Sequence, residues 1–205
     1  MGHDGARQMA LVSRSGATIV GVALGISLRP VIEADLDVMA RFATEPDAAG
    51  EFEWGGFADF NVTGRRWAED GLLADDSSFL AVILDDADFI GFVGFRDVSG
   101  RPTRGAPKRR ISVPCYEIGI VLLPEYRGKG FGTEAQRQLV GYLFATTPAY
   151  RVQASTAAGN LGEQRALEKV GFQREGVSRA AGYHNGEWVD GVHYGLLRDD
   201  GRPQG

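Results

Sequence analysis

Apolar residues recur along the chain with two different periods, and together these periods predict an α/β protein. Runs typical of β-strands occur about seven times, at residues 26–29, 79–84, 89–96, 112–123, 151–157, 172–183 and 188–197. Helical spacing occurs about four times, at residues 32–43, 63–73, 133–145 and 161–170. The dipeptide Asn185-Gly186 between the last two strands is a strong hairpin signal. We therefore expect one mixed α/β domain without repeats or an internal linker.

Two segments interrupt this pattern. Pro46 to Gly50 is expected to break the first helix, and an aromatic, glycine-bearing loop follows at residues 51–57. Residues 98–110 carry five basic side chains, two prolines and two glycines, with no acidic residue after Asp97. A solvated insertion between two strands is the simpler interpretation of this basic segment. Contact with phosphates or with an acidic substrate is the alternative.

Composition limits the function classes. The 205 residues fit one domain, which we place at residues 26–198, with an N-terminal extension at 1–25 and a C-terminal tail at 199–205. The net charge of −5 argues against nucleic acid as the main partner, because phosphate-backbone binding normally needs a basic surface. The single cysteine, Cys115, excludes an internal disulfide, and no cluster of histidines and cysteines has metal-ligand spacing.

The location of the protein follows from the absence of targeting signals. No apolar run approaches eighteen residues, so no membrane span is expected. Arg7 and Arg14 precede a mildly apolar stretch at residues 17–24, but Gly21 interrupts it and weakens the reading as a signal peptide. We expect a flexible or strand-forming extension there and a cytoplasmic protein.

A glycine-rich loop is the most informative motif. It comprises Pro124 to Thr133, reads Pro-Glu-Tyr-Arg-Gly-Lys-Gly-Phe-Gly-Thr, and lies between an expected strand and an expected helix. Such a strand–loop–helix unit aims backbone N–H groups and a positive helix terminus at one point, which suits a diphosphate. The residues after Lys129 do not fit a Walker loop, and the glycine register does not fit the dinucleotide fingerprint. An ordinary glycine-rich turn is the alternative.

The spacing Arg-x-x-Gly-x-Gly in this loop resembles the pyrophosphate motif of the GNAT superfamily of acetyl-CoA-dependent N-acetyltransferases, with Arg127, Gly130 and Gly132 at its fixed positions. A second block, residues 160–172, resembles the other signature of that family. There an Asn begins a helix that ends in Glu-Lys-x-Gly-Phe, as Asn160 and the sequence up to Phe172 do here. Two motifs in the right order and at the right spacing identify the superfamily far better than the substrate.

The second block is similar to the RimJ/RimL branch, which modifies protein N-termini and, in relatives, small amines. The opening Ile-Ser-Leu-Arg-Pro at residues 26–30 supports this branch. The chain departs from the family pattern in two places. Leu167 stands where many members carry the Tyr that reprotonates the thiolate, and Glu163 stands where a Ser is usual. The acid that protonates the leaving thiolate is therefore unassigned.

The resemblance implies a GNAT-like fold with a mostly antiparallel central sheet flanked by helices, and a splayed strand pair at the acetyl-CoA site. Acetyl-CoA is the implied cosubstrate, and no metal is expected. The residues implied to bind it are Val121, Leu122, Leu123, Arg127, Gly128, Lys129, Gly130, Phe131, Gly132, Thr133 and Asn160. Asn160 also has a simpler explanation, since Asn is a good helix N-cap.

The reaction needs a neutral amine, and Glu117 is the candidate base. It lies in the otherwise apolar run Tyr116 to Ile120, at the strand position where many family members keep a catalytic Glu. The alternative is a structural carboxylate that pairs with an Arg or faces water. For the acceptor, relatives wall their pocket in regions that correspond here to Phe52, Trp54, Phe57, Tyr183 and His184. Packing is the simpler role for the aromatic residues.

These patterns predict an acyltransferase that moves an acetyl group from acetyl-CoA to a primary amine by direct attack in a ternary complex. The acceptor is a small molecule or a protein N-terminus, and Glu51 and Glu53 favour a small cationic amine. One alternative is a non-catalytic coenzyme A-binding regulator of the same fold. Another is an unrelated α/β binding module whose glycine loop is only a turn. A homodimer is compatible with the branch, in which dimers are common.

Overall fold

The computed structural model describes residues 19–20, 24–74, 77–99 and 114–200. Its strands are β1 (Ile19–Val20), β2 (Ile26–Pro30), β3 (Ser77–Leu84), β4 (Asp88–Asp97), β5 (Cys115–Leu122), β6 (Arg151–Ala157), β7 (Gln173–His184) and β8 (Glu187–Leu197). Its helices are α1 (Leu36–Thr44), α2 (Pro46–Ala49), α3 (Asn61–Asp70), α4 (Phe131–Thr146) and α5 (Leu161–Val170). Within these residues the strands form one sheet in the order β1-β2-β3-β4-β5-β6-β8-β7.

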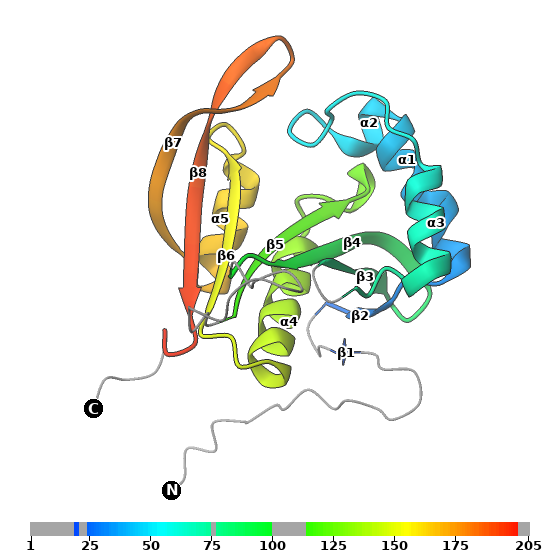
Figure 1. Ribbon diagram of the computed structural model, residues 1–205, viewed down its shortest axis with the longest axis horizontal. Coiled ribbons are helices and arrows are strands. Elements are labelled where there is room, and N and C mark those ends of the chain that lie inside the picture. Colours follow the sequence, from blue (N-terminus) through cyan, green and yellow to red (C-terminus); the bar gives the residue numbers. More distant parts are fainter. Residues whose placement is uncertain (1–18, 21–23, 75–76, 100–113, 201–205) are drawn as a thin grey trace, which may run out of the picture.

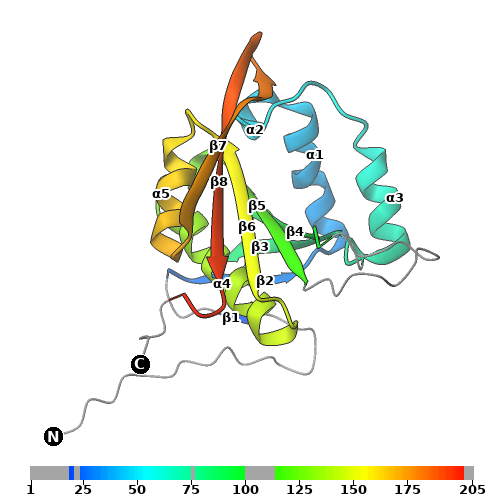
Figure 2. The ribbon, with the colours of Figure 1, turned by 60° about the vertical axis from the view of Figure 1, so that its left-hand side comes forward.

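The central strands are buried on both faces, and this divides the helices into two layers. Successive side chains of a strand point to opposite faces, so Leu80 and Val82 of β3 join one core cluster while Ala81 and Ile83 join another. The first cluster includes the buried faces of α4 and α5, and the second includes residues of α1 and α3. Figures 1 and 2 show these two helix pairs on opposite faces of the twisted sheet.

Local sequence signals explain several element boundaries. The Asn160 side chain accepts a hydrogen bond from the Glu163 backbone N–H and caps α5, and Gly171 ends that helix at φ +113°. Asn185 and Gly186 both have positive φ, as a tight hairpin between β7 and β8 requires. The mixed, mostly antiparallel α/β fold expected from the sequence is thus confirmed.

The structure corrects one expected element and shows a strand in the N-terminal extension, one of the two alternatives expected there. Pro46 to Ala49 form the short helix α2 instead of a plain break, because proline is tolerated in the first turn of a helix. Ile19 and Val20 pair with β2 and add an eighth strand to the expected seven. Most of the N-terminal extension and of the basic segment 98–110 lies outside the described residues, as does most of the tail.

Strands β5 and β6 run parallel but separate after a short common stretch. β5 pairs with antiparallel β4 from Tyr116 to Leu122, whereas its pairing with β6 covers the three positions Cys115 to Glu117. Beyond Glu117 the two strands diverge. The second half of β5 therefore leaves one edge of its backbone available at an opening in the middle of the sheet.

Candidate active site

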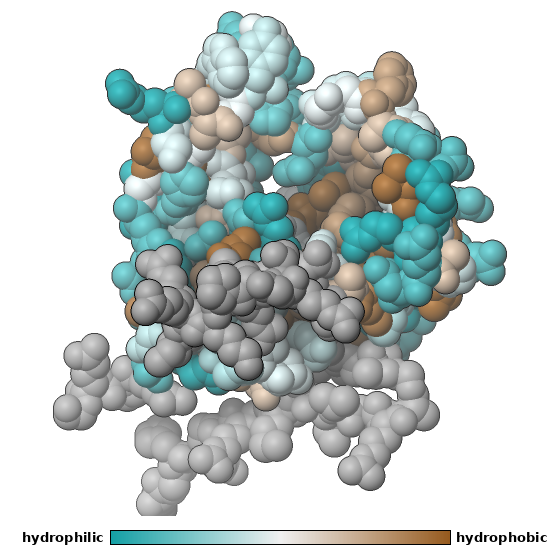
Figure 3. All heavy atoms as spheres, in the orientation of Figure 1, coloured by the Kyte–Doolittle hydropathy of each residue, from teal (hydrophilic) through white to brown (hydrophobic). Residues whose placement is uncertain are grey.

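A cavity of about 570 Å³ occupies this opening. Its walls are Ile118 to Leu122 of β5, Ser155 and Thr156 of β6, the glycine loop, residues along α5, and the loop after α2. The space-filling view shows the molecule hollowed between the β7–β8 side and the α1–α2 side (Figure 3). The expected splayed strand pair thus lies directly beside the expected phosphate loop.

The glycine loop forms the basic end of the cavity from backbone. Gly128 and Gly130 have φ values of +73° and +87°, a conformation that L side chains rarely adopt. Helix α4 starts at Phe131, and the N–H groups of a first helical turn have no partner within the helix. Gly130, at the N-cap position, has no side chain that could occupy this helix end. These groups can therefore bind an anion such as a diphosphate.

The Arg127 side chain forms its hydrogen bonds with the protein itself, and its role in coenzyme binding stays a prediction. Its Nε donates to the Leu122 carbonyl at 2.8 Å, and Nη2 donates to the carbonyls of Ala48 and Ala49, the latter at 3.1 Å. A Cβ at Gly50, next to α2, would lie 2.7 Å from Nη1. The guanidinium thus clamps the end of β5 to the end of α2 across the cavity wall. Its charge lies beside the cavity, but its hydrogen bonds go to the protein.

The other expected coenzyme residues divide into two groups. Those that line the cavity are Val121, Leu122, Arg127, Gly128, Gly130, Gly132, Thr133 and Asn160. Leu123 is buried in the core, Phe131 packs near Tyr126, and the Lys129 ammonium lies 5.8 Å from the centre of the Tyr126 ring. These three side chains lie outside the cavity lining, and their contribution stays a prediction.

Helix α5 adds cavity residues that sequence reasoning missed. Arg165 and Lys169 are four positions apart on this helix, and both line the cavity. Their spacing was a usable signal, because residues four apart share one face of a helix that starts at the capping Asn160. The two cations can attract the phosphates of a ligand whose other end occupies the opening in the sheet.

The loop after α2 forms an acidic end of the same cavity. Glu51, Phe52 and Glu53 all line it. Burial at the cavity wall raises the pKa of the Glu53 carboxyl, and the charges of His184 and Arg127 partly oppose this rise. Among the described residues no Lys or Arg forms an ion pair with Glu53, so its carboxylate is available to a cationic ligand.

The remaining acceptor candidates do not line the cavity. Trp54 and Phe57 form an edge-to-face pair with ring centres 5.3 Å apart, and Phe57 is 84% exposed. Tyr183 packs edge-to-face on Trp188 at the tip of the β7–β8 hairpin. The charge of His184 acts on Glu53, and the buried Nδ1 of His184 has no hydrogen-bond partner within the described part of the chain. Any role of these residues in acceptor binding stays a prediction.

Glu117 is held by an ion pair at the start of the splayed strand. Its Oε2 accepts from Arg96 Nε at 2.9 Å and from Arg96 Nη2 at 2.5 Å, because Arg96 lies directly opposite on β4. Its Oε1 accepts from the Ser155 hydroxyl at 3.3 Å, and Ser155 itself lines the cavity. This geometry favours the structural alternative for Glu117, and its role as a base stays a prediction.

Glu163 is a third acidic residue that lines the cavity, and it was not expected to act there. It lies in the first turn of α5 and accepts a hydrogen bond at Oε2 from Gln136 Nε2 of α4, at 3.3 Å. Burial and, to a smaller extent, the nearby carboxylate of Glu53 raise the pKa of the Glu163 carboxyl to about 7, against the opposing effect of the hydrogen bond from Gln136. A carboxyl with this pKa can both hold and release a proton near neutral pH.

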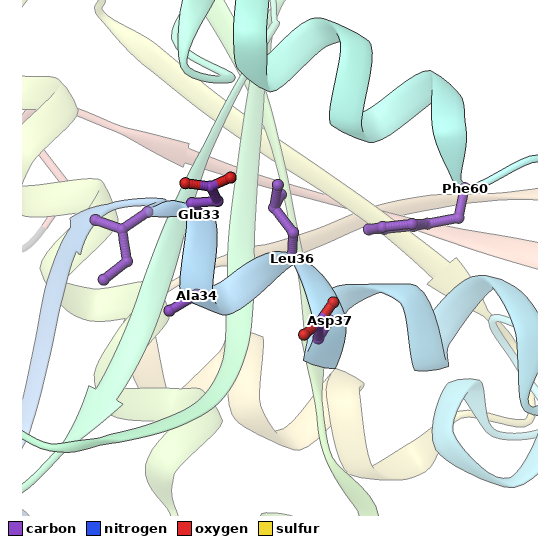
Figure 4. Close-up of a pocket in the computed structure, with 6 residues that line it drawn as sticks. Glu33, Ala34, Leu36, Asp37 and Phe60 are labelled. Carbon is purple, nitrogen blue, oxygen red and sulfur yellow. The ribbon is translucent and has the colours of Figure 1, made fainter.

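A second depression lies between the starts of α1 and α3, with Glu33, Ala34, Leu36, Asp37 and Phe60 around it (Figure 4). It has neither the glycine loop nor the opening in the sheet, so it offers no comparable chemistry. Within the described ranges no group of three or more His, Cys, Asp or Glu side chains could hold a metal ion. No helix in the same ranges is long and apolar enough to cross a membrane.

Similar proteins agree with this geometry. The Bacillus subtilis protein described as uncharacterized N-acetyltransferase YnaD is 30% identical over 127 residues, which are 62% of this chain and 68% of that protein. The ribosomal protein uS5-alanine N-acetyltransferase of Escherichia coli is 27% identical over 119 residues, 58% of this chain and 56% of the enzyme. The chain thus spans between about half and two thirds of these two relatives.

Two solved structures show the same fold. RimL, a ribosomal L7/L12 alpha-N-protein acetyltransferase in complex with coenzyme A, superposes with a TM-score of 0.69 at 15% identity over 88% of this chain and 98% of that one. Spermidine N-acetyltransferase from Vibrio cholerae, in complex with coenzyme A and spermine, has a TM-score of 0.69 at 18% identity, over 86% and 97%. The acetyltransferase (GNAT) domain family matches residues 26–173. The chain therefore belongs to the GNAT family of acetyltransferases, and it is an acyltransferase.

Proposed function

We propose that this protein transfers the acetyl group of acetyl-CoA to the primary amine of a small cationic acceptor. The observation that carries this proposal is the set of charged and polar groups that line one continuous cavity. Its wall combines the backbone N–H groups of the glycine loop, Arg165 and Lys169 with the carboxyl groups of Glu51 and Glu53. An anionic coenzyme and a cationic amine would be attracted to different parts of this lining, beside the opening between β5 and β6.

Direct attack of the amine on the thioester is the mechanism that the residues support. Backbone groups of β5 beyond Glu117 are free from pairing with β6 and can bind the pantetheine arm. Cys115 does not line the cavity, and burial raises the pKa of its thiol, which keeps it protonated and a poor nucleophile. We therefore expect a ternary complex without an acetyl-enzyme.

A protein N-terminus is the second candidate acceptor. The relative from Escherichia coli is named for the alanine of ribosomal protein uS5, and the exposed Phe57, Tyr183 and Trp188 could contact a peptide. The acidic end of the cavity favours the small cationic amine, because two carboxylates match a compact ammonium group better than an uncharged peptide backbone.

The test has two stages. Calorimetric titration with acetyl-CoA measures coenzyme binding, and a thiol-release assay then compares spermidine, benzylamine and a synthetic peptide that starts with alanine. We expect micromolar binding, acetylation of spermidine above the other two, and initial-rate lines that intersect. Preference for the peptide would favour the second candidate. No binding of acetyl-CoA would contradict the proposal altogether.

A further inference from the structure

Glu163 has neighbours that suit a proton carrier. It lines the cavity from the first turn of α5. Its backbone N–H donates a hydrogen bond to the Asn160 side chain at 3.2 Å, which fixes the position of its backbone. Its carboxylate forms no ion pair with any Lys or Arg of the described residues. A charge that is partly buried and unpaired is costly, so the protonated form is favoured.

Gln136 can support Glu163 in both of its protonation states. The residue is 1% exposed, and its Nε2 donates to Glu163 while its Oε1 is buried without a hydrogen-bond partner among the described residues. Rotation of the amide group by half a turn exchanges Nε2 and Oε1, and the two orientations have nearly identical shapes. The same side chain can thus donate to a Glu163 carboxylate or accept from a Glu163 carboxylic acid.

The charged groups around Glu163 come from each neighbouring element. Glu53 in the loop after α2 is the nearest acid, while Arg127 and His184 act on Glu53. Arg165 and Lys169 line the same cavity from α5. Helix α4 contributes the neutral Gln136, and β6 contributes the neutral hydroxyls of Ser155 and Thr156.

We propose that Glu163 is the catalytic acid that protonates the departing sulfur of coenzyme A, with Gln136 as its positioning residue. This inference rests on the proposed function. The amine lone pair forms the C–N bond, and the electron pair of the breaking C–S bond goes to sulfur. Sulfur takes the proton of the Glu163 carboxyl, the product nitrogen loses its extra proton to water, and the Glu163 carboxylate is reprotonated from solvent.

The direction of the proton transfer favours an acid over a base. Burial raises the pKa of Glu163 to about 7, whereas an ordinary thiol has a pKa of about 8.5 and an alkylammonium one of about 10.4. Transfer from Glu163 to a thiolate is therefore downhill, and transfer from an ammonium to Glu163 is uphill. Leu167, in the next turn of α5, has no proton to donate and is fully buried.

The first test compares wild type with Glu163→Gln, Gln136→Leu and Glu168→Gln over pH 5.5 to 9, with acetyl-CoA and spermidine, or whichever amine of the panel above is acetylated fastest. In wild type we expect kcat to fall above a pH of about 7, as Glu163 loses its proton. Glu163→Gln should reduce kcat roughly a hundredfold and abolish that fall. Its dissociation constant for acetyl-CoA, measured by calorimetry, should stay within a few-fold of wild type.

Of the other two variants, Gln136→Leu tests the positioning residue and Glu168→Gln is the control. Gln136 lowers the pKa of Glu163 through its hydrogen bond, so Gln136→Leu should move the fall in kcat to higher pH. Glu168→Gln changes an exposed carboxyl of the same helix that does not line the cavity, and should leave the profile unchanged. A pH profile of kcat for Glu163→Gln equal to that of wild type would overturn this inference alone. The same holds if the variant loses an increase of kcat with pH and keeps the fall. Binding of acetyl-CoA without turnover of any amine would refute the proposed function as well.

A second readout needs no acceptor. The pKa of Glu163 is raised in the folded state from 4.5 to about 7, so the folded protein holds this proton more tightly than the unfolded chain does. Wild type should therefore lose stability relative to Glu163→Gln as the pH rises from 4.5 to 7, and lose no more of it at higher pH. Calorimetric melting curves measure this. Equal pH dependence of the two proteins would show that Glu163 does not retain a proton and would overturn the inference.

Discussion

The two ends of the cavity are built from different parts of the chain. The end at the glycine loop consists mainly of backbone from one continuous segment, in which Gly128 and Gly130 have positive φ and α4 follows directly. The acidic end consists of the side chains of Glu51 and Glu53 after α2, and the charge of His184, far away in the sequence at the end of β7, acts on Glu53. A local pattern can specify the first, whereas the second depends on the tertiary fold.

This difference predicts how each end responds to substitution. Recognition by backbone N–H groups tolerates changes of side chain but not of backbone conformation or of local charge. Recognition by carboxylates depends on individual charged groups, and each group contributes a limited share of the binding energy of the ligand. Substitutions in the glycine loop should therefore have larger effects than substitutions at the acidic end.

The largest effect is expected for Gly130→Asp. The residue is the N-cap of α4 at φ +87°, and a carboxylate there would repel the phosphates of acetyl-CoA. We expect calorimetry to show at least a roughly hundredfold weaker binding of acetyl-CoA, which corresponds to about 2.7 kcal/mol. Gly130→Asn is the matched control, because it adds the same shape without the charge. Equal losses in the two variants would mean that strain, and not charge, is responsible.

Arg127 sharpens the comparison. It belongs to the phosphate motif, but its side chain donates hydrogen bonds to protein carbonyls. Arg127→Ala should lower the free energy of unfolding by about 2 kcal/mol, since bonds from charged donors are lost. Urea titration measures this. Arg127→Lys keeps the charge but cannot form the same fork of bonds, so we expect little rescue of stability. Full rescue of both stability and acetyl-CoA binding by Lys would contradict the clamp and favour a simple charge effect.

Much of the fold, and the conformation of the glycine loop, could be predicted from sequence because the signals are local. The glycine loop, the capping Asn160 and the Asn185-Gly186 turn each act on backbone within a few residues of themselves. The short helix α2 was missed because Pro46 indicates a helix start as well as a break. Such ambiguity is settled by tertiary contacts, here the bonds from Arg127 to the carbonyls of Ala48 and Ala49.

The roles of Glu117 and Glu163 were less predictable, since the role of each carboxylate depends on its partner. Glu117 and Glu163 are both glutamates beside the splayed strands, but Glu117 has Arg96 opposite it in the register of β4 and β5. Glu163 instead meets the neutral Gln136 from α4. Strand register and helix packing decide this, and neither is visible in the periodicity of the chain. The departure at Glu163 from the family pattern was the one available signal.

Glu53→Gln tests the acidic end directly. Removal of this cavity carboxylate should raise the KM for spermidine about tenfold while the KM for acetyl-CoA stays constant, because the lost attraction acts on the cation. Because the pKa of Glu53 is raised, the KM of wild type for spermidine should also fall as the pH rises through that raised value. Steady-state kinetics with benzylamine, an acceptor that has no charged group besides its amine, provides the comparison. A larger effect on acetyl-CoA than on spermidine would reverse our assignment of the two ends.

The smallest effect is expected for Glu117→Gln, although the family resemblance makes Glu117 the candidate base. Its carboxylate is neutralised by Arg96, whose side chain is 64% exposed, and it reaches the cavity through the Ser155 hydroxyl. An ion pair with so exposed a partner contributes less than about 1 kcal/mol, so stability should change little. We expect kcat/KM to fall less than about threefold, within the range of a lost surface ion pair. Arg96→Gln should reproduce this loss, and the double variant should add nothing further, because both changes remove the same interaction.

A tenfold or larger fall in kcat for Glu117→Gln, with a changed pH profile and no such fall for Arg96→Gln, would instead establish Glu117 as the base. The ion pair would then serve to orient a carboxylate that acts through Ser155, and proton removal and proton donation would be divided between Glu117 of β5 and Glu163 of α5.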